Sequence, residues 1–239
     1  MYKKLLVGLL CAMFLVSIAS ASELRGYEKK KGYDYVYLGA YPQTLNGDIL
    51  PIKWRVLEVK DNIAYLFSEY VLFNHRIHPD DREWVKFGAA FNQTEIFGIL
   101  NGEFLQKAFA EKEQTSMVYT EELGRIFLVS KEDLKNRAYG FGSNLSRKGF
   151  GTEYALANGL FQYYKRYGSH SPYWTRSQSR TKAFGGVCTK QNGSLGYIRV
   201  VVMQEGIRPA LYLDLSTIKI TGGLGTFDEP YILEHLELK

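Results

Sequence analysis

The chain has 239 residues, of which 46% are hydrophobic and 15% aromatic, a size and composition that suit one domain with a large core. Its 30 basic and 25 acidic side chains are interspersed and give a net charge of +5. This mild excess does not indicate a nucleic-acid-binding protein.

Residues 1–21 have the pattern of a signal peptide. Lys3 and Lys4 precede an apolar run over residues 5–18, and residues 19–21, Ala-Ser-Ala, suit a cleavage site. The apolar run is shorter than the roughly 20 residues that a membrane-spanning helix needs. We therefore expect a protein exported to the periplasm or the medium, with no transmembrane segment in the mature chain.

Cysteine usage excludes an internal disulfide from this mature chain, because Cys11 belongs to the signal peptide and Cys188 is then alone. Cys188 is interpreted as a small buried side chain or, alternatively, as a reactive thiol. A flexible segment at 22–34 is expected to lead into a single domain at 35–233, with a tail at 234–239.

The first half of the domain predicts a small sheet and then short helices. The expected elements, in chain order, are strands at 35–39, 54–59 and 63–67, helices at 94–100 and 103–110, and a strand at 125–129. A polar turn at 60–62 joins the second and third strands. Asn92 is predicted to cap the first helix with Glu95 reaching back to it, and Asn101-Gly102 to separate the two helices. Ser130 is predicted to cap a further short helix.

The second half predicts a loop, a helix and a β-meander. Glycines make 139–151 a loop, and apolar spacing indicates a helix from Thr152 to Lys165. Asn192-Gly193 is typical of a type I′ hairpin turn. The meander strands are expected at 173–176, 183–190, 195–203 and 208–214.

Six short strings follow one another along the chain. They are L-G-A-Y-P-Q at 38–43, W-R-V-L-E at 54–58, L-N-G-E-F-L at 100–105, T-E-Y-A at 152–155, W-T-R-S at 174–177 and G-I-R-P-A at 206–210. As a set they resemble a bacterial family of exported domains of unknown function marked by W-L-R-S and G-V-R-P-A. That family is distantly similar to the C-type-lectin-like fold shared with formylglycine-generating enzymes.

The resemblance implies an α+β, C-type-lectin-like domain with two or three short helices, a twisted antiparallel sheet and a C-terminal β-meander. It implies no activity, because related folds do different things. The motif residues are expected to be structural: Trp54, Asn101, Thr152, Arg176, Arg208 and Pro209. For the two arginines, we expect buried ion pairs with acids such as Glu153 or Asp214, whose loss would cost about 3–5 kcal/mol.

A tyrosine-rich segment is the best candidate contact surface, because tyrosine and tryptophan combine large contact area with polar tips. Its residues are Tyr163, Tyr164, Tyr167, His170, Tyr173 and Trp174. The alternative interpretation places Tyr164 and Trp174, together with the neighbouring Phe161, in the core.

Other chemistry is disfavoured, and no metal or cofactor is predicted. His75, His78 and the aspartates that follow are interpreted as a polar loop, because the spacing does not aim both imidazoles at one point. The carboxylate strings of calcium-dependent lectins are missing from the sequence, and formylglycine-type oxidation needs a cysteine pair.

The sequence therefore favours a non-catalytic binding module for a glycan, an envelope component or a cell-surface protein. Two alternatives remain: a cell-envelope enzyme related to the formylglycine-generating fold, with Cys188 near His170 or a carboxylate, and a structural envelope protein without a small ligand.

Overall fold

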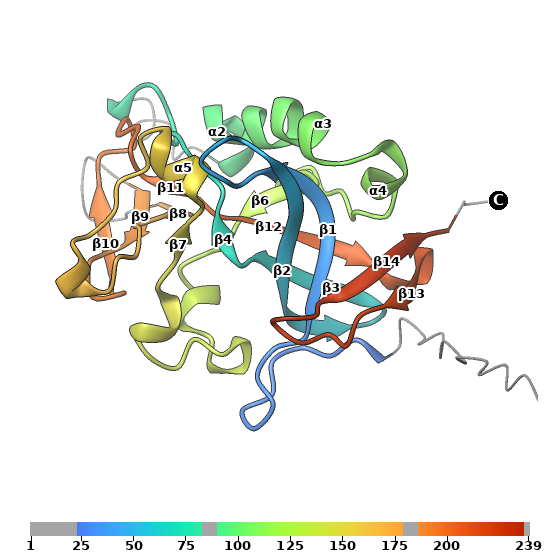
Figure 1. Ribbon diagram of the computed structural model, residues 1–239. Helices are drawn as coiled ribbons and strands as arrows, with labels where there is room; N and C mark the ends of the chain where they lie inside the picture. Colours follow the sequence, from blue (N-terminus) through green and yellow to red (C-terminus); the bar gives the residue numbers. More distant parts are fainter. Residues whose placement is uncertain (1–22, 83–89, 179–185, 237–239) are drawn as a thin grey trace, which may run out of the picture.

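The computed structural model describes residues 23–82, 90–178 and 186–236, so the predicted signal peptide lies outside the described residues. These residues form an α+β domain built on a mixed sheet of seven strands in the order β13-β14-β1-β2-β3-β12-β6. Short helices α2, α3 and α4 lie along one face of this sheet (Figure 1). The three-stranded sheet β10-β9-β8 lies at the opposite end of the molecule from β13 and β14 (Figure 1).

The large sheet contains β1 (Tyr35–Pro42), β2 (Ile49–Lys60), β3 (Ile63–Ser68), β6 (Ile126–Leu128), β12 (Pro209–Asp214), β13 (Ile218–Gly222) and β14 (Tyr231–His235). The smaller sheets contain β4 (Tyr70–Val71), β5 (Phe73–Asn74), β7 (Phe150–Gly151), β8 (Trp174–Gln178), β9 (Gly186–Thr189), β10 (Leu195–Ile198) and β11 (Gly206–Ile207). The helices are α2 (Glu95–Ile99), α3 (Leu105–Ala108), α4 (Glu111–Thr115) and α5 (Glu153–Ala157), with a π-helical turn η3 (Leu100–Phe104) between α2 and α3. Single 3₁₀ turns occur at η2 (Phe91–Gln93), η4 (Asp133–Lys135), η5 (Arg137–Tyr139), η6 (Leu145–Arg147), η7 (Lys165–Tyr167) and η8 (Leu215–Thr217).

The predicted opening sheet is confirmed, since β1, β2 and β3 are consecutive antiparallel neighbours. At the tip of the β2–β3 hairpin, Asp61 and Asn62 have φ of 50° and 64°, the backbone that a two-residue primed turn requires. The indole of Trp54 donates to the carbonyl of Leu38 at 2.8 Å and joins β2 to β1 inside the core. The large sheet is mixed, and not purely antiparallel as expected, because β14 pairs in parallel with β1.

The helical region differs from prediction in its caps. Thr94, and not Asn92, caps α2, because its hydroxyl accepts from the amide of Phe97 at 3.2 Å. Glu95 binds Arg76 at 2.9 Å and does not close a capping box. Asn101 does not end the helix, which continues through the π-helical turn. Tertiary partners therefore override the local signals at Glu95 and at Asn101, which bonds Ile126.

The helix predicted from Thr152 to Lys165 is shorter than expected. Thr152 caps α5 through a bond from the amide of Ala155 at 3.1 Å, as expected. The helix ends at Ala157 and not at Lys165, because Gly159 adopts φ of 100° and Leu160 turns inward to become buried. Residues 160–170 are thereby released to form a loop beside β9 and β10.

The predicted meander is correct for three of its four strands. Strands β8, β9 and β10 form one antiparallel sheet, but β12 lies in the large sheet between β3 and β6. Its buried apolar side chains pack against the main core, where Ala210 pairs with Phe67. The β9–β10 turn contains a left-handed residue at Gly193 but not at Asn192, so it is not type I′.

Both ends of the described chain belong to the domain. Leu24 is buried and the amide of Tyr27 bonds the carbonyl of Leu57 at 3.2 Å, so part of the segment expected to be flexible at 22–34 packs against β2. At the other end, β14 continues to His235, which is buried and bonds Ser116. Over the described ranges, the helices are too short or too polar to cross a bilayer.

Candidate functional site

A groove of about 860 Å³ opens between the β9–β10 turn and the loop at 163–168. Three kinds of side chain line it. They are the cations Lys148, Arg166 and Lys190, the carboxylate Glu205, and the tyrosines Tyr163 and Tyr197. Gln191, Asn192 and Ser194 add amide and hydroxyl groups at its edge. The site therefore combines aromatic rings, hydrogen-bonding groups and an excess of positive charge.

One wall of the groove is a closed loop. The amide of Tyr163 donates to the carbonyl of His170 at 2.9 Å, and the Gln162 side chain donates to the carbonyl of Ser169 at 3.0 Å. Gly168 and Ser169 supply the left-handed backbone that reverses the chain, with φ of 92° and 50°. These contacts hold the turn η7, which carries Arg166, beside β9.

His170 joins this loop to the sheet. It is fully buried, its ring centroid lies 4.9 Å from that of Tyr163, and its Nε2 lies 3.3 Å from the carbonyl oxygen of Lys190. The histidine ring therefore packs against Tyr163 and helps to orient it, and His170 itself does not line the groove.

The opposite wall is the β9–β10 turn. The amide of Lys190 donates to the carbonyl of Ser194 at 2.7 Å, and the amide of Ser194 to Asn192 Oδ1 at 2.9 Å. Gly193 lies against the chain at Asn144, so closely that an added Cβ would be 1.8 Å from the Asn144 carbonyl oxygen. This contact brings the turn next to Lys148.

Of the six predicted contact residues, only Tyr163 is found among the described residues that line the groove. Tyr163 lines the groove, and Tyr164 is 75% exposed next to it. His170, Tyr173 and Trp174 are fully buried, so the prediction that they contact a ligand is corrected. The side chain of Tyr167 lies outside what the structure describes.

The buried pair have clear structural roles. The Tyr173 hydroxyl donates to the carbonyl of Arg147 at 2.7 Å, and the Trp174 indole donates to the carbonyl of His75 at 2.8 Å. Tyr173 thus ties the chain just before β8 to η6, and Trp174 ties β8 to the segment that follows β5. Sequence reasoning did not select the groove cations. Arg166 lies inside the tyrosine-rich segment, but no local pattern links it to Lys148 or Lys190.

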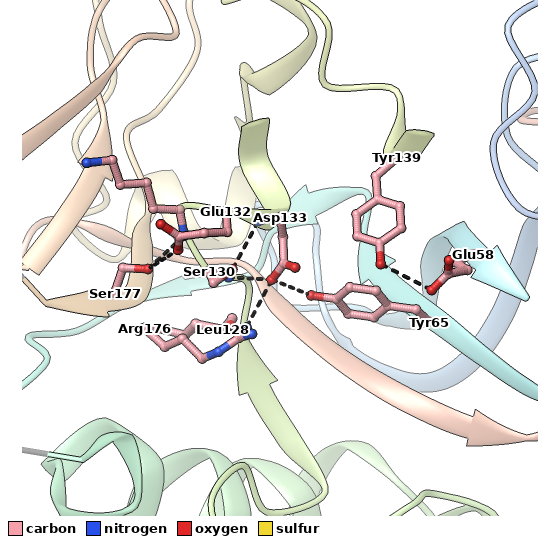
Figure 2. Close-up of polar contacts among 10 residues, drawn as sticks. Glu58, Tyr65, Leu128, Ser130, Glu132, Asp133, Tyr139, Arg176 and Ser177 are labelled. Carbon is pink, nitrogen blue, oxygen red and sulfur yellow. Dashed lines mark hydrogen bonds and ion pairs between the residues drawn. The ribbon is translucent and has the colours of Figure 1, made fainter. Parts of the chain in front are cut away.

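Arg176 forms the kind of ion pair predicted, but with Asp133 (Figure 2). Asp133 Oδ2 accepts from the Ser130 amide at 2.6 Å, the Tyr65 hydroxyl at 3.0 Å and Arg176 Nη1 at 3.2 Å. Burial, together with the charge of Asp133, raises the pKa of Tyr65 well above its usual value. Neither Glu153 nor Asp214 takes part, and the cluster fastens η4 to β3 and β8.

Arg208 contradicts the expectation of a paired acid. It is fully buried, its Nε donates to the carbonyl of Ser68 at 2.7 Å, and its guanidinium carbon lies 4.0 Å from the ring centre of Phe67. Within the described part of the chain, Nη1 and Nη2 have no partner in good hydrogen-bonding geometry, although the Tyr173 side chain interacts with the guanidinium. Burial and the nearby charge of Arg55 lower the pKa of Arg208.

The other motif residues also serve the scaffold. The Asn101 side chain makes four hydrogen bonds: it donates to the carbonyls of Phe97 and Ile126, and accepts from the amides of Arg125 and Ile126. Pro209 is buried at the start of β12. We therefore assign these strings to packing and hydrogen bonding within the fold.

The histidine segment does not assemble a metal site. His75 Nδ1 lies 2.9 Å from the carbonyl oxygen of Arg76, and His78 Nδ1 lies 3.0 Å from that of Asp80. Across residues 23–82, 90–178 and 186–236, no three His, Cys, Asp or Glu side chains are grouped to hold a metal ion. Cys188 pairs through its backbone with Gly196, and its side chain lies outside the description.

Compared with protein-family models, curated proteins and solved structures, the chain matches none of them. The family resemblance carried by the six strings therefore remains a prediction, and the function must be argued from the groove.

Proposed function

We propose that this protein is a non-catalytic carbohydrate-binding module and that the groove is its binding site. The observation that carries the proposal is the convergence of Tyr163 and Tyr197 with amide, hydroxyl and charged groups around a space of about 860 Å³. That volume lies within the roughly 300–1,000 Å³ typical of small-ligand sites. Tyrosine rings offer stacking surfaces for sugar rings, and the polar side chains offer partners for hydroxyl groups.

The proposal includes a C-type-lectin-like fold and export by residues 1–21. What supports the fold is the order of the six strings over residues 38–210, together with an α+β architecture of short helices on one large sheet. The structural use of Trp54, Asn101 and Arg208 agrees with motifs that specify a scaffold and leave the binding surface free to vary.

The groove favours binding over hydrolysis. Glycosidases of the common kind use two carboxyl groups on opposite sides of the scissile bond. Among the described side chains that line the groove, Glu205 is the single carboxylate, and it is only 6% exposed. A bound saccharide would therefore meet hydrogen-bonding and charged groups without an acid and base pair.

The test is a binding screen of the exported protein on an array of bacterial and host glycans. Tyr163→Ala and Tyr197→Ala are expected to weaken any binding about tenfold, since loss of one stacking ring removes roughly 1 kcal/mol or more. Tyr119→Ala is the matched control, because Tyr119 is 58% exposed and does not line the groove.

The proposal is wrong if the protein binds no saccharide. It is also wrong if binding is unchanged in both groove variants while the Tyr119→Ala variant behaves like the natural protein.

A further inference from the structure

The groove has a charge imbalance that a neutral sugar does not require. Lys148, Arg166 and Lys190 line it against one carboxylate, that of Glu205, so the lining carries an excess of two positive charges. A fourth cation lies at the edge, where Lys131 Nζ is 3.3 Å from the Tyr197 hydroxyl. The whole chain has a charge of only +5 over 239 residues, so this local excess is concentrated and not a general property of the surface.

Two of these cations, Lys148 and Lys190, pack against glycine residues. Lys148 Nζ lies over Gly168, where an added Cβ would be 3.4 Å from it, and the Lys148 Cγ lies equally close to Gly193. The aliphatic part of Lys190 lies flat across Gly196, where an added Cβ would be 1.9 Å from Cε. Both lysine side chains thus lie against bare backbone, and both residues line the groove.

The position of the third cation follows from the closed loop. Arg166 is in the turn η7, which the Tyr163–His170 backbone bond and the left-handed Gly168 hold beside β9. Tyr163 lies in the same wall, so a ring-stacking surface and a guanidinium group come from one short loop. A guanidinium can bind both oxygens of a carboxylate in one plane.

We infer that the groove selects acidic saccharides, whose carboxylate would be bound by Lys148, Arg166 and Lys190 while the sugar ring contacts Tyr163. This inference rests on the proposed carbohydrate-binding function and adds the chemical class of the ligand. Walls of low dielectric strengthen the attraction of the cations for an anion inside the groove. The tyrosines and amides favour a sugar acid over a flexible acidic peptide, because they supply ring contacts and hydroxyl partners.

The test compares each acidic saccharide with a neutral analogue of similar size. One pair is oligogalacturonate and its methyl ester; the other is the N-acetylglucosamine–N-acetylmuramic acid disaccharide and chitobiose, which has no lactyl carboxylate. Calorimetry with the exported protein should show each acid binding about tenfold tighter than its neutral partner, the effect expected of two or three partly exposed ion pairs. Added salt should reduce this preference.

Variants assign the preference to the groove. Lys148→Gln combined with Lys190→Gln should remove most of the preference for the acid, and Lys148→Gln alone should remove part of it. Lys60→Gln is the control, because Lys60 is exposed at the β2–β3 turn and does not line the groove. Unfolding temperature and tyrosine-dependent binding of the neutral partner show whether each variant is folded.

The outcomes separate this inference from the function on which it rests. If neutral partners bind as tightly as acids, and Tyr163→Ala weakens both, the groove binds sugars and the inference is overturned. If poly-glutamate binds as tightly as the acidic saccharides, the groove recognises charge alone, and the inference is again overturned. If no saccharide of either kind binds, the proposed function itself fails.

Discussion

Three charged side chains inside the domain allow a sharp test of how its buried arginines are stabilised. Arg55 binds Glu69 Oε2 through Nε at 2.7 Å and Nη2 at 2.5 Å, and both side chains are only 11–12% exposed. Arg208 is fully buried nearby, where the charge of Arg55 disfavours its protonated form and that of Glu69 favours it. Replacing Glu69 with Gln leaves two buried guanidinium groups with no anion between them. We expect Glu69→Gln to lower the free energy of unfolding by about 3–5 kcal/mol.

Arg208→Met should have a very different effect, because it removes a buried charge. The losses are the bond to the Ser68 carbonyl, about 1.5–3 kcal/mol, and the contact with the Phe67 ring, about 2 kcal/mol when desolvated. The gain is the desolvation cost of a guanidinium with two unbonded nitrogens, which is several kcal/mol. These nearly cancel, so the net change is expected to be within about 1.5 kcal/mol of zero.

Combining the two changes gives the decisive measurement. Arg208→Met should restore about 1–3 kcal/mol to the Glu69→Gln protein, since it removes one of the two unpaired charges. Urea unfolding followed by the fluorescence of the buried Trp54 and Trp174 gives the four free energies. Glu121→Gln is the control, because Glu121 is exposed. The reasoning is refuted if Arg208→Met alone costs 3–5 kcal/mol and gives no recovery in the Glu69→Gln background.

Three further predictions concern single positions. Asn101→Ala should cost about 3–4 kcal/mol in urea unfolding, since four hydrogen bonds at about 1 kcal/mol each are lost; a cost below about 1 kcal/mol would contradict their importance. Gly39→Ala should lower the free energy of unfolding by about 2 kcal/mol or more, because Gly39 has φ of 65° and a Cβ would lie 2.5 Å from the Phe109 ring. Gly98→Ala is the control, because Gly98 is helical with open space around it, and this change should be neutral or stabilising. Burial lowers the pKa of His235 below its ordinary 6.5, so the unfolded chain binds more protons than the folded one. The free energy of unfolding should therefore fall as pH decreases through about 6.5. His235→Gln should flatten that part of the pH profile, and an unchanged slope would rule out this role for His235.

Short-range signals were sufficient wherever the chain satisfies its own backbone. The β2–β3 hairpin follows from a polar turn between two apolar strands, and Thr152 caps α5 through a residue three positions away. The motif strings likewise indicate scaffold, and Trp54, Asn101 and Pro209 all lie in it. Such interactions join residues that are close in sequence, so a sequence pattern is enough to predict them.

Long-range packing decided the positions where prediction failed. The helix predicted to reach Lys165 ends at Ala157, because burying Leu160 in the core stabilises the fold more than a further helical turn on the surface would. The partners of Arg176 and Arg208 come from η4 and from β3, elements that no local rule places beside them.

The groove illustrates the same division. Its tyrosine-rich loop is visible in the sequence, and the pattern of short strands and helices already predicts an α+β domain. The cations at positions 148, 166 and 190 are separated by many residues and carry no shared pattern. They line one groove where three segments pack together, with Gly168, Gly193 and Gly196 leaving space for the two lysine side chains, and that proximity exists only in the folded chain.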